Sequence, residues 1–272
     1  MNSYLNIILM VVAISALLIV VMWFSNYRIR QQANMRYQQG IDWLQQLRKL
    51  LTSVQQHRGL TNGYLNGDDS AKIRIAELQR QISQVIAKLN QQGQWIKRSE
   101  RWSSIQDHWA RLSTNYINHQ ASYALEQHNR LVMNVLHLIE DCAEQHHLQE
   151  LQLTSNQPAE ELWKSTLFNA EYIGQARALG TGVAASAHCG SVERIRLKYL
   201  HSKLEEYQLS VATSQIKGKL SPLLSSMEAN VMVSHPSIKP ADYFALATEA
   251  LDTVLVGFDQ GLEQLNRQIK TT

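Results

Sequence analysis

The sequence begins with a long apolar segment and continues as a polar chain with helical spacing. Residues Ile7 to Phe24 form an apolar run of roughly 18 residues, in which Ser15 is the one polar residue, and this length is enough to span a bilayer as a helix. Trp23 and Tyr27 lie at its end, where aromatic side chains anchor helices at the membrane interface. The pattern predicts a transmembrane anchor over residues 1–28, with residues 7–24 in the membrane.

The charges on the two sides of this segment predict its orientation. No Lys or Arg precedes the run, whereas three arginines follow it: Arg28, Arg30 and Arg36. Because basic residues favour the cytoplasmic side, we expect a single-pass protein of the inner (cytoplasmic) membrane with its body in the cytoplasm. A periplasmic body held by an uncleaved anchor is an alternative. A cleaved signal peptide is another, although it favours a basic start, a shorter apolar core and a small-residue cleavage site.

Beyond the anchor, apolar residues recur at three- and four-residue steps, which is typical of amphipathic helices. In the first half of the body this spacing predicts helices over residues 29–65, continuing the membrane helix, and over 71–91, 100–118 and 121–147. Four antiparallel helices with short loops predict a helical bundle.

The polar stretch at residues 148–157 lacks this periodicity and indicates a boundary. After it we expect helices over 158–187, from Ser191 onward, near 222–231 and from 240 to about 268.

The predicted fold class is therefore all-α, with two up-down four-helix bundles in series that share long helices, preceded by one N-terminal transmembrane helix. The body, residues 29–272, divides into a first bundle at residues 29–150 and a second at residues 151–272.

Composition excludes several classes of function. The formal net charge of +3 is small, and the aromatic residues do not interleave with basic runs, so we expect no nucleic-acid partner. Two cysteines without CxxC spacing indicate neither a disulfide framework nor a metal site, and no cofactor is expected. No arrangement of side chains suggests an enzyme.

One pattern, Gln-x-Arg-x-Leu-x-x-Gly, occurs twice, starting at Gln56 and at Gln175. Each copy carries small residues at four-residue steps, and such ridges let helix backbones approach closely. Tight helix packing alone is one interpretation. The small residues are Gly59, Gly63 and Gly67 in the first copy and Gly174, Ala178 and Gly182 in the second.

The arginines of the two copies, Arg58 and Arg177, favour a second interpretation. A guanidinium drawn between packed helices must be paired, because a buried unpaired charge costs several kcal/mol. No acidic residue lies one helical turn from either arginine, and Glu171 is six positions before Arg177 and off its face. Three arrangements would each compensate the charge of the arginines: a carboxylate from another helix, exposure of the guanidinium groups to solvent, or a bound anion.

A planar oxyanion suits an arginine, which donates parallel hydrogen bonds to two oxygens. If both arginines reach one pocket, an anion would join the two halves of the body. Neutral donors close to them in sequence would support such a site: Gln56, Thr61, Asn62, Gln175 and Thr181.

Three segments resemble the nitrate- and nitrite-sensing (NIT) domain family. His57 to Leu65 looks like the family's first arginine motif, Gly174 to Gly180 resembles its second, and Asp242 to Asp252 resembles its C-terminal helix. The resemblance covers about residues 44–265. It departs from the pattern at His57, where family members carry other charged residues.

The resemblance implies two helical bundles with nitrate or nitrite between them, arginine ligands and a homodimer formed through long helices. It also implies a further arginine late in the domain, for which Arg194 and Arg196 are the candidates. No output module follows, so we expect a membrane-anchored sensor that signals to an unidentified partner protein. A helical scaffold without a small ligand, and a sensor of a different small molecule, are the alternatives.

Overall fold

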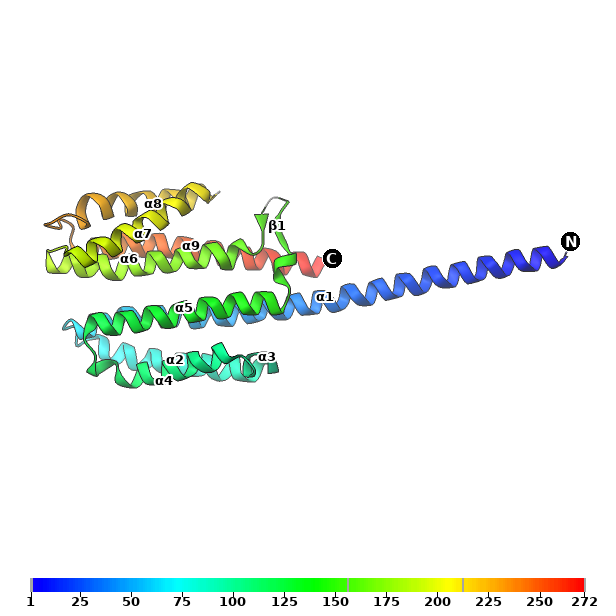
Figure 1. Cartoon of the computed structure of the whole chain (residues 1–272), viewed down its shortest axis with the longest axis horizontal. Coiled ribbons are helices and arrows are strands. Elements are labelled where there is room, and N and C mark those ends of the chain that lie inside the picture. Colours follow the sequence, from blue (N-terminus) through cyan, green and yellow to red (C-terminus); the bar gives the residue numbers. More distant parts are fainter. Residues whose placement is uncertain (1, 156, 212, 272) are drawn as a thin grey trace.

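The computed structural model describes residues 2–155, 157–211 and 213–271, and the described chain is almost entirely helical. Its first helix, α1 (Asn2–Leu65), runs without a break from the apolar segment into the body. Figure 1 shows the N-terminal part of α1 projecting far beyond the other helices. Between Leu9 and Phe24 the side chains are exposed, and this helix is long and apolar enough to cross a membrane.

The first bundle forms where α1 meets the helices that follow it. They are α2 (Ala71–Gln92), α4 (Glu100–Asn115) and α5 (Ala121–Gln145), with the single turns α3 (Gln94–Lys97) and η1 (Tyr116–Asn118) between them. The helix predicted over 100–118 therefore ends as a 3-10 turn. At its start the Ser99 hydroxyl accepts a hydrogen bond from the Trp102 backbone N–H, as an N-cap does.

The boundary region between the bundles contains a small β-hairpin, which the polar pattern did not predict. Strand β1 (Gln152–Thr154) pairs antiparallel with β2 (Gln157–Pro158). Leu153 is buried, and its carbonyl accepts a hydrogen bond of 2.5 Å from the Gln264 side chain. The hairpin thus packs on the last helix.

The second bundle follows the hairpin. A π-helical turn, η3 (Leu162–Thr166), leads into α6 (Leu167–Ser186), followed by α7 (Ser191–Ser210) and α8 (Ser214–Ser226). A second π-helical turn, η4 (Met227–Val231), precedes α9 (Pro240–Thr271).

Two predicted boundaries in this bundle were wrong. The helix expected from residue 158 begins at Leu162, after the hairpin, and the helix expected near 222 begins at Ser214. Pro222 lies inside α8, where proline removes a backbone hydrogen bond and normally breaks a helix. Ile216 and Leu220 are nevertheless buried, and packing of this apolar face outweighs that cost.

The two bundles are consecutive along the chain but lie side by side in space (Figure 1). Helices α1 and α5 of the first bundle face α6 and α9 of the second, and one continuous hydrophobic core includes residues of both bundles. The surface between the bundles is therefore the place where a side chain of one half reaches the other.

The surroundings of the glycines differ from what close helix packing along the small-residue ridges predicts. Gly59 is exposed with no side chain near it, Gly63 has only Asp68 nearby, and Gly67 lies in the turn after α1 with a φ of +102°, so the first ridge is not a helix contact. In the second motif Gly180 is buried, and a Cβ there would lie 2.6 Å from the Tyr243 hydroxyl oxygen.

We expect Gly180→Ala to destabilise the protein by about 1–3 kcal/mol, because the buried Tyr243 ring must move and its 3.1 Å hydrogen bond to the Ala176 carbonyl is lost. Gly182→Ala is the matched control, since that glycine is exposed on the same helix with open space around it. It should gain about 0.5–1 kcal/mol from helix propensity. Urea unfolding of both variants checks this, and equal effects would contradict the packing role.

Candidate functional site

Arg58 occupies the centre of the contact between the bundles. It lies on the core-facing side of α1, and its side chain is 1% exposed. Its partner is Glu171 of α6, whose side chain is fully buried. The Nη1–Oε1 distance is 2.5 Å and the Nη2–Oε2 distance is 3.2 Å, so the guanidinium donates to both carboxylate oxygens.

The pairing decides one of the alternatives left open by the sequence. The acid that pairs with Arg58 is Glu171, which comes from another helix, α6. Arg177 is on the same helix as Glu171 but on a different face. Gly174 makes room for the pair, since a Cβ there would lie 2.7 Å from Arg58 Nη2.

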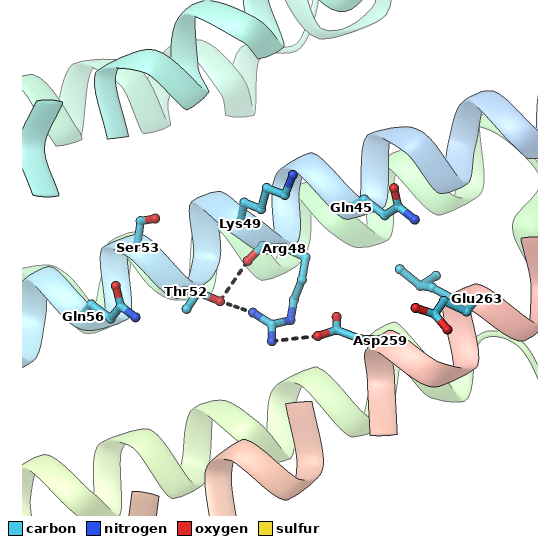
Figure 2. A pocket seen from close by; sticks show the side chains of 9 residues that line it. Gln45, Arg48, Lys49, Thr52, Ser53, Gln56, Asp259 and Glu263 are labelled. Atoms are coloured by element: carbon cyan, nitrogen blue, oxygen red, sulfur yellow. Dashed lines mark hydrogen bonds and ion pairs between the residues drawn. The ribbon is translucent and has the colours of Figure 1, made fainter. Parts of the chain in front are cut away.

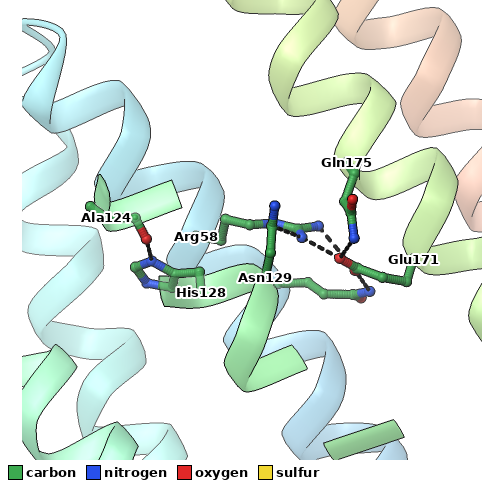
Figure 3. A network of polar contacts seen from close by, with 7 residues as sticks. Arg58, Ala124, His128, Asn129, Glu171 and Gln175 are labelled. Atoms are coloured by element: carbon green, nitrogen blue, oxygen red, sulfur yellow. Dashed lines mark hydrogen bonds and ion pairs between the residues drawn. The ribbon is translucent and has the colours of Figure 1, made fainter. Parts of the chain in front are cut away.

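Three amides surround the ion pair (Figure 3). The Gln55 side chain donates to Glu171 Oε2 at 2.9 Å, and that of Gln175 donates to Oε1 at 2.8 Å. Arg58 Nη1 also donates to the side-chain Oδ1 of Asn129 at 2.7 Å. Helices α1, α5 and α6 therefore meet in one polar network inside an otherwise apolar contact.

Arg177 lies on α6 in a different environment. It is half-buried, donates to the Thr248 hydroxyl at 3.0 Å and stands over the Phe244 ring, 4.9 Å from its centre. Within the described part of the chain it makes no ion pair. Burial and then the charge of Arg58 lower the pKa of Arg177, whereas the charges of Asp252 and Glu171 act in the opposite direction, so Arg177 lies within electrostatic reach of the Arg58–Glu171 pair.

The other predicted donors are spread over several places. Of these, Gln175 joins the ion-pair network, while Thr61 contacts His57 Nδ1 at 3.3 Å inside the first bundle. Asn62 accepts a hydrogen bond from Asn66 near the end of α1. Thr181 has a buried hydroxyl without a partner among the described residues.

The remaining candidates also lie apart from the pair. Arg194 donates to the Cys189 carbonyl at 3.2 Å. Gln56 is exposed in a groove of about 560 Å³ between α1 and α9, where Arg48 approaches Asp259 at 3.5 Å (Figure 2). Burial lowers the pKa of Arg48 and raises that of Asp259.

A second cavity adjoins the Arg58 network. It has a volume of about 450 Å³ and lies between α5, α6 and α7. Asn129 and Gln175, which both belong to the network, line it, and Arg196 and Glu126 line it as well. The buried pair therefore lies close behind the wall of an open cavity.

His57, one residue before Arg58, points away from the contact and into the first bundle. It is fully buried, and its Nδ1 lies 2.8 Å from Nε2 of His128. Burial lowers the pKa of His57 to about 4 and that of His128 to about 3. Both imidazoles are neutral at pH 7 and serve as core groups, not as anion ligands.

The fold and the buried Arg58–Glu171 pair define an almost entirely helical protein with a polar site between two bundles. A family model described as "nitrate and nitrite sensing" (NIT) matches residues 49–268, and the chain belongs to this family. This confirms the resemblance found in the sequence.

One solved structure is similar over most of its length. The structure of the NasR transcription antiterminator aligns with a TM-score of 0.70 at 15% identity, covering 93% of this chain and 74% of that chain. This similarity shows a shared fold. No curated protein matches the chain.

The His57–His128 pair predicts a loss of stability at acid pH. Since the pKa values in the folded protein lie below the unfolded value near 6.5, the unfolded chain binds more protons between these limits. The contribution of each histidine to the free energy of unfolding should therefore be fully present well above pH 6.5 and should fall by on the order of 2–4 kcal/mol as the pH drops toward 4.

Denaturant unfolding at pH 7.0 and pH 4.5 measures this loss. The variant His57→Phe/His128→Leu should lose less stability between the two pH values, whereas a control, His188→Gln at an exposed position, should behave like the wild type. The same loss in the double variant would exclude the pair as its cause.

Proposed function

We propose that this protein is a membrane-anchored sensor that binds nitrate or nitrite between its two bundles and signals through a change in their packing. The family assignment supports a sensor of nitrate and nitrite. Arg58 and Arg177 are the proposed anion ligands, with Gln175 as the neutral donor that the network favours.

One observation carries the site. Arg58 pairs with Glu171 in the contact between the bundles, and Arg177 lies close enough for the charges of Arg58, Glu171 and Asp252 to act on it. Arg177 is half-buried and makes no ion pair within the described part of the chain. Because Arg177 donates one hydrogen bond to Thr248 and keeps further N–H groups, a small anion beside it would gain both charge and hydrogen bonds.

A sensor needs an equilibrium that the anion shifts, and the packing of the two bundles is the proposed equilibrium. An anion held by arginines of α1 and α6 would favour one arrangement, to the extent that it binds the two arrangements unequally. We propose that a homodimer carries the signal to a partner protein. Neither step requires contact with nucleic acid.

The nitrate site is tested on the full chain in detergent, by calorimetry and by the change in melting temperature at constant ionic strength. Nitrate or nitrite should raise the melting temperature, by linkage of binding to folding, and chloride should not. Arg177→Met should weaken binding by roughly tenfold or more, since a charge-assisted donor is lost. The control is Arg267→Met, at an exposed arginine of α9.

Nitrate binding that survives Arg177→Met unchanged would reject Arg177 as a ligand. No effect of nitrate or nitrite on the wild type would favour a scaffold that has no small ligand, or a sensor of another molecule.

We also propose that α1 spans the inner membrane once near its N-terminus, with the body in the cytoplasm. The exposed apolar stretch from Leu9 to Phe24 supports a span, and the arginines after it support this side by the positive-inside rule.

The variant Val12→Arg/Leu17→Arg should release the protein from the membrane fraction, because each arginine costs about 2.5–3.5 kcal/mol at the centre of a span. Carbonate extraction measures this. Val256→Arg, at an exposed position of α9, is the control and should stay in the membrane. Protease digestion of inside-out vesicles would distinguish a cytoplasmic from a periplasmic body.

A further inference from the structure

The carboxylate of Glu171 already has the surroundings that an anion-binding protein provides for its ligand. Its two oxygens accept four hydrogen bonds: two from Arg58, one from Gln55 and one from Gln175. The side chain is fully buried. These donors come from α1 and α6, so each bundle contributes to them.

A carboxylate and a nitrate or nitrite ion present similar faces to such donors. Each has oxygens bound in one plane to a central atom, and each matches the two parallel N–H groups of a guanidinium. The donors around Glu171 would therefore also fit the external anion of the proposed function. In the structure these donors are occupied by a side chain of the protein itself.

We propose that Glu171 is an internal anion that holds the sensor in its ligand-free packing, and that nitrate or nitrite competes with its carboxylate for Arg58, Gln55 and Gln175. This inference rests on the proposed function and names the group that opposes the ligand. Glu171 would then set the affinity and the concentration range of the response without being a ligand.

The competition gives the anion a direct effect on packing. Glu171 is attached to α6, so its bond to Arg58 fastens the second bundle to α1 of the first. A free anion satisfies Arg58 without that covalent attachment to α6. Exchange of one for the other therefore preserves hydrogen bonds to the arginine while removing one tie between the bundles.

The cavity between α5, α6 and α7 provides a place from which the exchange can begin. Asn129 and Gln175 line this cavity and also contact the ion pair. A rotation of these two amides would connect the pair to the cavity without separating the bundles. Arg196 and Glu126 line the cavity as well, and Glu126 is paired with Arg130, so Arg196 supplies a positive charge near this opening that Glu126 does not pair with.

The test is to remove the carboxylate and ask whether a free anion replaces it. Glu171→Ala in the full chain leaves Arg58 unpaired beside a space of carboxylate size. The melting temperature is measured in sodium formate, nitrate, nitrite and chloride at constant ionic strength, and nitrate affinity by calorimetry. Formate should raise the melting temperature of this variant more than that of the wild type, and nitrate should bind roughly tenfold more tightly or better.

Two variants serve as controls. Asp141→Ala removes a partly exposed carboxylate from Arg101, 2.6 Å away, and should create no response to formate because water solvates the arginine. Arg58→Met/Glu171→Met replaces both charges by apolar groups, and it should fold but show neither gain. If Glu171→Ala folds only with formate or nitrate present, that dependence supports the internal anion.

The failures are distinguishable. A wild type that binds nitrate, together with a Glu171→Ala variant that binds it no better and ignores formate, would overturn the internal anion and leave the proposed function standing. A Glu171→Ala chain that folds in none of the anions would overturn it as well. A wild type that binds neither nitrate nor nitrite would instead remove the proposed function.

Discussion

The packing of the two bundles depends on one ion pair, between Arg58 and Glu171. Burying two charges costs more than their attraction returns unless hydrogen bonds satisfy the rest of both groups. Here Gln55 and Gln175 donate further hydrogen bonds to the Glu171 carboxylate, and Asn129 accepts one from the Arg58 guanidinium. The alignment of α1 and α6 is thereby restricted, because a small displacement of either helix would leave a buried charge with unmade bonds. Apolar contacts alone would tolerate such a shift.

The two copies of the repeated motif show that a local pattern does not determine a side chain's partner. Arg58 and Arg177 stand at the same place in the same sequence pattern, yet one is paired with a buried carboxylate and the other with a hydroxyl and an aromatic ring. The difference arises from the facing helices: α6 presents Glu171 to the first, and α9 presents Thr248 and Phe244 to the second. Arg177 therefore has no ion pair within the described part of the chain, although the charges of Glu171 and Asp252 both act on it.

Much of the fold was predictable because it follows from periodicity. The three- and four-residue spacing located α1, α2, α4 and α5 to within a few residues, and it placed Arg58 on the core side of α1. The helix expected near 222–231 misses the start of α8 because proline favours the first turn of a helix, whereas the buried face of Ile216 and Leu220 extends this helix before Pro222. The hairpin was missed because β1 and β2 are too short for an alternating pattern to be visible.

The site was predictable only in part, for a different physical reason. Glu171 lies six positions before Arg177, and helical geometry alone separates the two. Glu171 instead pairs with Arg58, which lies 113 positions earlier in the chain on another helix. A contact of that kind depends on how two bundles meet, which spacing within one helix does not encode. The sequence did identify Gly174, but as a packing residue, whereas it makes room for the guanidinium.

The course of α1 connects the ion pair to the apolar end of the protein. Arg58 and the segment ending at Phe24 belong to one helix without a proline, and a rise of 1.5 Å per residue separates them by about 50 Å. Gly40, between them, is close to the His146 side chain of the first bundle, so the helix is fixed there against its own bundle. A change at Arg58 that moves α1 relative to α6 therefore cannot be absorbed by a flexible joint. Such a change would be carried along α1 toward the projecting apolar segment, because the described helix has no break between them.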